Sequence, residues 1–147
     1  MTSSINRLQY LCDTIPVLLY AINDEDLSQP IGPGKWSRKQ IIGHLIDSAA
    51  NNHQRFVRGQ FEDTPYISYN ADNWVDHGYY QQIPSTQLIN FWEAYNRQLL
   101  LLAMHIPAHL LSRTVNTGDE QPHTLQWIIE DYVVHLEHHL QEIVDYQ

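Results

Sequence analysis

The chain has 147 residues, and a chain of this length can bury most of its apolar surface in one core. Its 8 Lys and Arg against 17 Asp and Glu give a net charge of −9, which argues against a nucleic-acid surface because such surfaces need a basic stripe. No apolar run approaches the roughly 18 residues of a membrane span, and the N-terminus lacks the basic start and apolar segment of a signal peptide. We therefore expect one domain over residues 1–147, cytoplasmic, with no membrane or nucleic-acid partner.

Four segments carry apolar residues at the helical intervals of three and four, and no alternating pattern predicts a strand. Ser37 is a good N-cap for the second segment, and Pro84 directly precedes the third. The sequence therefore predicts an all-α fold whose helices cover about 3–24, 37–62, 85–105 and 124–147.

The segment between the second and third helices, about residues 63–84, is unusually long for a structureless loop in a compact domain. When extended it can span about 70 Å, which is enough to return along a whole helix. The second and third helices can then run parallel, and this gives a four-helix bundle of up-down-down-up order. Tyr66, Tyr69 and Trp74 in this crossover either line the mouth of a pocket or, the commoner role, pack the crossover itself.

His44 lies in the middle of the second predicted helix, among apolar residues. Asp47, Ser48 and Asn51 follow it at spacings of three, four and seven, so a polar strip begins at His44. Polar groups inside a bundle must be hydrogen-bonded or bound to something. Taken alone, however, a histidine in such a strip is more often a satisfied or exposed side chain than a metal ligand.

The last helix contains three histidines in YVVHLEHHLQEI. His135 and His139 are four residues apart, a spacing that puts two imidazoles on one helix face and that also serves HExxH zinc sites. Surface histidines on an acidic helix explain the pattern equally well, and His135 with His138 is a second possible pair. We prefer His139 to His138 as a ligand, because His139 lies closer to the core face marked by Leu136 and its apolar neighbours.

A third imidazole from His44 would complete a set of three ligands with one open position, which is how catalytic zinc sites are built. Structural zinc sites are usually closed by four ligands. Cys12 is the only cysteine, so a multi-cysteine zinc site is excluded, and its place in the first helix suggests a buried thiol.

Three stretches of the chain together resemble the DinB-like superfamily, in the branch that contains bacillithiol S-transferases and their metal-dependent hydrolase relatives. The stretches are KWSRKQIIGHLIDSAANNHQRF, PYISYNADNW and YVVHLEHHLQEI. The resemblance implies an up-down-down-up four-helix bundle, often a homodimer, with zinc or nickel held by His44, His135 and His139. One departure is Glu142, which stands where the transferase relatives often have a fourth histidine.

The resemblance and the spacing leave several supporting roles open. Asp47, Asn51, Asp131 or Glu142 could hydrogen-bond a ligand imidazole and fix its tautomer, and His138 would be a neighbour of the metal ligands.

Three functions follow from these observations. The first is a metal-dependent enzyme, either a thiol S-transferase using a low-molecular-weight thiol or a hydrolase, acting on a small molecule. The second is a non-catalytic, stress-related metal-binding bundle or interaction module, which the loss of the fourth histidine at Glu142 favours. The third, nucleic-acid binding, is disfavoured by the net charge of −9.

Overall fold

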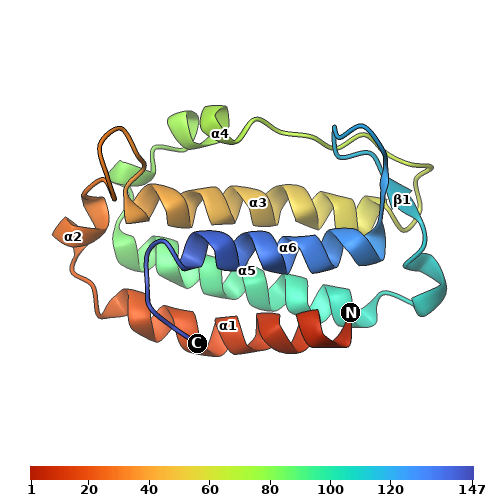
Figure 1. Cartoon of the computed structure of the whole chain (residues 1–147), viewed down its shortest axis with the longest axis horizontal. Helices are drawn as coiled ribbons and strands as arrows, with labels where there is room; N and C mark the ends of the chain where they lie inside the picture. Colours follow the sequence, from red (N-terminus) through yellow and green to blue (C-terminus); the bar gives the residue numbers. More distant parts are fainter.

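The computed structural model describes all 147 residues and shows a four-helix bundle with short elements at its ends (Figure 1). The predicted all-α fold is confirmed, and no helix combines the length and the hydrophobicity needed to cross a membrane. The four long helices are α1 (Thr2–Tyr20), α3 (Arg38–Arg58), α5 (Ser85–His105) and α6 (Leu125–Leu140). The short elements are α2 (Asp24–Ser28), α4 (Ala71–Gly78), the 3₁₀ turns η1 (Tyr80–Gln82) and η2 (Ala108–Leu110), and the strands β1 (Thr114–Val115) and β2 (His123–Thr124).

The long helices have the predicted up-down-down-up order. In Figure 1, α1 and α6 run in one direction, whereas α3 and α5 run in the other. α1 packs against α5 and α6, and α3 packs against the same two helices, so α1 and α3 occupy opposite corners of the bundle. The predicted crossover returns along α3, and it carries α4, which packs on the outer side of α3.

Three of the predicted helices are shorter than expected at their C-terminal ends. α1 ends at Tyr20, because Asn23 caps a new helix by accepting a hydrogen bond from the backbone N–H of Asp26. α3 ends at Arg58, and the chain packs so closely at Gly59 that an added Cβ would lie 2.7 Å from the backbone oxygen of Arg55. α6 ends at Leu140.

The small antiparallel hairpin was not expected from the sequence, which showed no strand pattern. Its strands pair Thr114 with Thr124 and Val115 with His123. Strands of two residues are too short to show an alternating pattern, so the hairpin depends on packing and not on local preference.

The N-terminus of α3 forms as the sequence predicts, and this fixes the position of His44. The Ser37 hydroxyl accepts a hydrogen bond from the backbone N–H of Gln40, and the Gln40 side chain accepts one from the backbone N–H of Ser37. The apolar faces of the long helices then close over one continuous core, whose fully buried members include Leu11, Leu45, Trp92, Leu99 and Leu136.

Candidate metal centre

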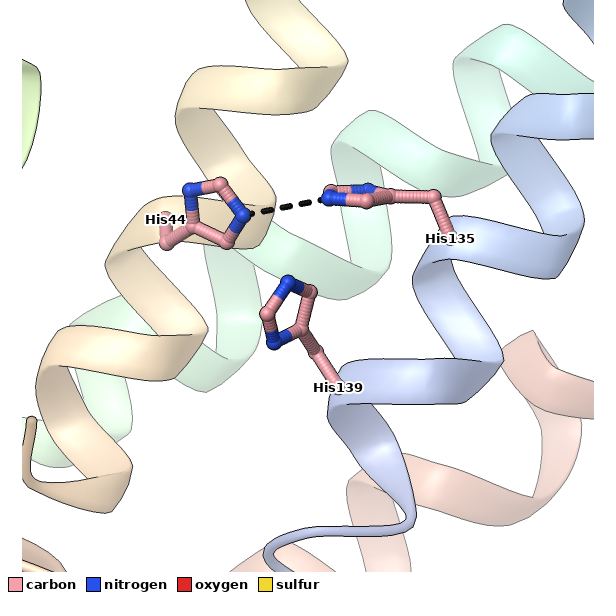
Figure 2. A group of neighbouring side chains, drawn as sticks. All are labelled: His44, His135 and His139. Atoms are coloured by element: carbon pink, nitrogen blue, oxygen red, sulfur yellow. Dashed lines mark hydrogen bonds between the residues drawn. The ribbon is translucent and has the colours of Figure 1, made fainter. Parts of the chain in front are cut away.

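Three histidine side chains converge between α3 and α6 (Figure 2). His44 comes from α3, and His135 and His139 come from successive turns of α6. One ring nitrogen of each points toward the space between the rings, and the atoms able to bind a metal all lie within 4.8 Å of one another. The structure therefore brings together the three residues that the sequence singled out.

The spacing of the nitrogens fits a shared metal ion. Nε2 of His44 lies 3.2 Å from Nε2 of His135. Two nitrogens on one tetrahedral zinc ion, each about 2.0–2.1 Å from the metal, would be roughly 3.3 Å apart. The buried Nδ1 atoms of His44 and His139 have no hydrogen-bond partner, although buried polar atoms in proteins nearly always have one. The cluster is thus not a closed hydrogen-bond network, and its donor set fits a divalent metal.

The electrostatics of the cluster favour neutral imidazoles. Burial lowers the pKa of His44 to about 3 and that of His135 to about 4, and the neighbouring imidazoles add to both shifts. Burial also lowers the pKa of His139, while Glu142 opposes the shift. All three rings are therefore neutral at pH 7, and the neutral imidazole is the form that binds metals.

Glu142 and His138 lie at the C-terminal side of the cluster. Oε1 of Glu142 is 3.2 Å from Nδ1 of His139 and 3.5 Å from Nε2 of His138. The first contact is close but poorly directed for a hydrogen bond, so a small movement of the Glu142 side chain would complete it. His138 is 72% exposed, whereas the His139 ring lies 4.6 Å from the His44 ring between their centroids. This geometry favours His139 over His138 as the partner of His44.

Asp47 and Asn51 are buried, but neither is hydrogen-bonded to an imidazole. Asp47 Oδ1 accepts a hydrogen bond from the Tyr80 hydroxyl, and Asp47 Oδ2 has no partner. Burial raises the pKa of this carboxyl to about 6, although the Tyr80 hydrogen bond opposes the shift. The Asn51 amide donates to the Asp47 backbone oxygen at 2.9 Å. These two residues shape the wall of α3 beside the cluster and do not orient a ligand ring.

Tyr80 and Trp36 also adjoin the site, and no spacing pattern in the sequence predicts this. At Gly43 an added Cβ would lie 2.1 Å from the Tyr80 ring, so the glycine beside His44 lets this ring rest on α3. The Trp36 ring, just before the start of α3, lies 5.1 Å from the His44 ring between centroids. A glycine next to a candidate ligand was the one sequence signal for such a close approach.

The predicted pocket residues of the crossover line two separate hollows. Tyr69 lines a cavity of about 170 Å³ that reaches His135, and Trp74 lines a more open hollow of about 450 Å³ beside Asp47. The two aromatic rings meet edge to face, 5.9 Å apart between centroids. Both residues thus combine packing of the crossover with contact to a hollow near the cluster.

Arg55, late in α3, also lines the cavity at His135. The crossover covers this part of α3 and leaves Arg55 only partly exposed. Arg55 lies eleven residues after His44, which is close to three helical turns, so its place on the same face was a usable signal.

The family is established by comparison with known proteins. Residues 7–143 match the DinB superfamily, and the chain belongs to this family. A relative from Halalkalibacterium halodurans, named "Putative metal-dependent hydrolase BH0277", is 24% identical over 140 residues, which cover 95% of this chain and 81% of the relative. YfiT from Bacillus subtilis, which bears the same functional name, is 27% identical over 126 residues, covering 84% of this chain and 71% of YfiT.

The solved structure of Bacillus subtilis YfiT has the same fold. It superposes with a TM-score of 0.87 and 22% identity over 97% of this chain and 82% of YfiT. That structure is described as a four-helix bundle of unusual topology.

Proposed function

We propose that this protein is a metal-dependent enzyme that acts on a small molecule at a centre formed by His44, His135 and His139. The observation that carries the proposal is the convergence of three neutral imidazoles within 4.8 Å, two of them with buried Nδ1 atoms that have no hydrogen-bond partner. The names of the relatives, which describe metal-dependent hydrolases, agree with this proposal.

The donor set suits one divalent ion of zinc or nickel, because imidazole nitrogen is a preferred ligand of both metals. Three protein ligands leave a position open, and a metal there supplies a Lewis acid that lowers the pKa of water or holds a thiol as its thiolate. Glu142, placed at Nδ1 of His139, can accept its hydrogen and so fix the tautomer that directs the other nitrogen inward. The hollow at His135 gives a small substrate a place beside the ligands.

Hydrolysis and thiol S-transfer place different demands on the protein. The relatives' names support hydrolysis. Thiol S-transfer is supported by the resemblance of three stretches of the chain to the branch that contains bacillithiol S-transferases. Attack by a thiolate on an electrophile needs no protein base once the thiol is deprotonated. We retain both reactions, with the homodimer and the cytoplasmic location as further expectations.

Metal analysis tests the centre directly. Protein purified without a histidine tag should contain about one zinc or nickel ion per chain, and His139→Ala should lose it. His109→Ala, which removes an exposed histidine outside the cluster, is the matched control. Full metal occupancy in the triple variant His44→Ala/His135→Ala/His139→Ala would overturn the proposed centre.

Turnover separates an enzyme from a non-catalytic metal-binding bundle. The metal-loaded protein should accelerate either hydrolysis of activated esters and amides or the reaction of small thiols with monochlorobimane. The His139→Ala variant should return both reactions to background. A protein that binds the metal fully but turns over neither class of substrate would support the non-catalytic interaction module instead.

A further inference from the structure

A small polar cavity of about 170 Å³ lies between α3 and α6, directly beside His135. Ser48, Asn52 and Arg55 line it from α3, and Asp131 lines it from α6. Pockets for whole drug-sized ligands usually measure about 300–1,000 Å³, so this cavity suits only one end of a substrate. The charged side chains in its walls indicate the chemical class of the group that it binds.

Arg55 brings a positive charge to the α3 wall without forming an ion pair. Its Nε and Nη2 atoms donate to the backbone oxygen of Ile67 at 3.1 and 2.9 Å, and Nη1 approaches the Asn52 side-chain oxygen at 3.4 Å. These bonds hold the guanidinium in place but leave N–H donors on both Nη atoms without a partner. Arg7, Arg58 and Arg97 each form an ion pair, whereas Arg55 has none. A fixed, partly buried guanidinium with free donors fits a carboxylate.

Asp131, whose side chain is exposed to solvent, brings a negative charge without an ion pair to the opposite wall. Its carboxylate forms no hydrogen bond and no ion pair, and partial burial raises its pKa. The other carboxylate of the cavity, Asp119, is already paired with Nε2 of His123 at 2.8 Å. The cavity therefore presents one unpaired cation on α3 and one unpaired anion on α6.

We propose that this cavity binds the α-amino-acid end of the substrate, with the carboxylate on Arg55 and the ammonium group on Asp131. A simple carboxylic acid would satisfy Arg55 but would face the carboxylate of Asp131, whereas a zwitterion satisfies both walls. Because the charged end is held on this side, the side chain of the amino acid is the part that reaches His135. The reacting group is accordingly carried by that side chain.

This inference rests on the proposed function, because it names the substrate class for the same three-histidine centre. The binding itself, however, depends on Arg55 and Asp131 and not on a metal. It can therefore be measured on metal-free protein, where an amino acid cannot bind by direct chelation of a metal ion.

The test titrates ¹⁵N-labelled, metal-free protein with L-alanine, propionate and ethylamine, and follows the backbone amide signals of α3 and α6. L-Alanine should bind saturably at the cavity, and propionate and ethylamine should each bind at least tenfold more weakly. Equal binding of propionate and L-alanine would overturn the zwitterion site. Absence of saturable L-alanine binding would overturn it as well.

Substitutions at Asp131 and Arg55 test which residue holds each charged group of the ligand. Asp131→Asn leaves the fold undisturbed because the carboxylate has no partner. It should weaken L-alanine binding at least tenfold but should not weaken propionate binding, because it removes the negative charge that propionate would face. Arg55→Lys should weaken L-alanine and propionate alike. Asp63→Asn, which removes an exposed carboxylate of the crossover, is the matched control and should change neither affinity by more than about twofold. Unchanged L-alanine affinity in Asp131→Asn would refute the assignment.

Metal content measured on the same samples keeps the two proposals apart. If wild-type protein binds L-alanine but no metal, the zwitterion site is supported and the three-histidine metal centre is refuted. If it binds metal but not L-alanine, the metal centre is supported and the proposed substrate class is refuted.

Discussion

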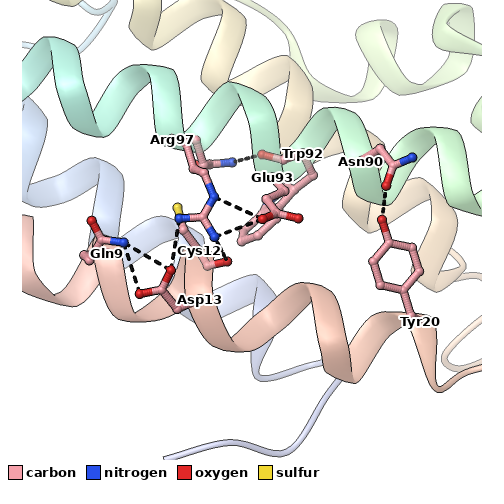
Figure 3. Close-up of polar contacts among 9 residues, drawn as sticks. Gln9, Cys12, Asp13, Tyr20, Asn90, Trp92, Glu93 and Arg97 are labelled. Carbon is pink, nitrogen blue, oxygen red and sulfur yellow. Dashed lines mark hydrogen bonds and ion pairs between the residues drawn. The ribbon is translucent and has the colours of Figure 1, made fainter.

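The α1–α5 interface and the α3–α6 interface of this bundle treat polar groups in opposite ways. Between α1 and α5, polar side chains lie at the rim and have partners: Arg97 contacts Asp13 at 3.0 Å, Glu93 at 2.9 Å and the backbone oxygen of Cys12 at 3.0 Å (Figure 3). Between α3 and α6, His44 and His139 are turned into the bundle and each leaves a buried nitrogen without a partner.

The difference teaches where to look for function in a bundle of this kind. A satisfied polar group at an interface costs little and specifies how the helices meet, whereas a buried cluster with unmet hydrogen-bonding capacity needs an additional ligand. A lone unpartnered atom is not enough, since the buried Trp92 Nε1 also lacks a partner but lies in the apolar core. Three of the four buried atoms without a partner, His44 Nδ1, Asp47 Oδ2 and His139 Nδ1, lie on α3 and α6, and this concentration distinguishes that side of the bundle.

The largest expected effect is a loss of stability when a buried side chain of α5 is truncated. Trp92→Ala should destabilise the protein by about 3–5 kcal/mol, because it removes a fully buried aromatic side chain and leaves a cavity. Chemical denaturation of the metal-free protein measures this loss. Phe91→Ala, which truncates an exposed aromatic next to it, is the control, and equal losses in the two variants would contradict the role assigned to the α5 core.

The next largest expected effect is a loss of metal affinity at the α3–α6 interface. His135→Ala should weaken zinc or nickel binding at least 100-fold, about 2.7 kcal/mol or more, because one of three ligands is lost. In wild-type protein, metal at 100 times its dissociation constant should raise the free energy of unfolding by about 2.7 kcal/mol, and the variant should lose this gain. Competition with a chromogenic chelator and thermal melts with and without metal give the two readouts. A metal-dependent stabilisation of equal size in His135→Ala would show that the metal binds elsewhere.

A smaller effect concerns the pH dependence of the metal-free protein. Because the pKa values of His44 and His135 are lowered from about 6.5 to about 3 and about 4, the unfolded chain takes up protons first as the pH falls. The histidine contribution is therefore complete above pH 6.5 and is lost below it, by at least about 1.4 kcal/mol by pH 5. Asp47, whose pKa is raised to about 6, acts in the opposite direction.

Comparing wild type with His135→Gln isolates the contribution of His135 to the pH dependence of the unfolding free energy, since both proteins have the same carboxylates. Their difference in unfolding free energy should shift in favour of the variant as the pH falls from 7 to 5. A difference that is independent of pH would mean that His135 titrates normally in the folded chain.

The smallest expected effect follows from removing the ion pairs of Arg97 at the polar rim between α1 and α5. Arg97→Ala should cost less than about 1 kcal/mol, because its ion pairs are solvent-exposed and screened. It should also leave metal affinity within about twofold, because Arg97 lies outside the α3–α6 site. Urea denaturation and metal titration test both parts, and a loss of metal affinity comparable to that of His135→Ala would remove the distinction between the two interfaces.

The sequence by itself determined the helical class, the long helices and the order of the bundle. The apolar spacing marked the helices, and the length of the 63–84 segment indicated that α3 and α5 are parallel. These features are local or depend on chain length, so the sequence carries them directly. The ends of α1, α3 and α6 and the hairpin were misjudged, because capping at Asn23, close packing at Gly59 and two-residue strands are set by contacts and not by periodicity.

The candidate site divides in the same way. The spacing of His135 and His139 on one helix, and the family resemblance, pointed to the three histidines before their geometry was known. Only the tertiary structure decided that His44 lies 3.2 Å from His135, that Glu142 and not Asp47 approaches a ring, and that Arg55 lines a cavity. The physical reason is that burial and pairing across α3, α6 and the crossover depend on how the helices dock, and residues distant along the chain carry no local signal of that docking.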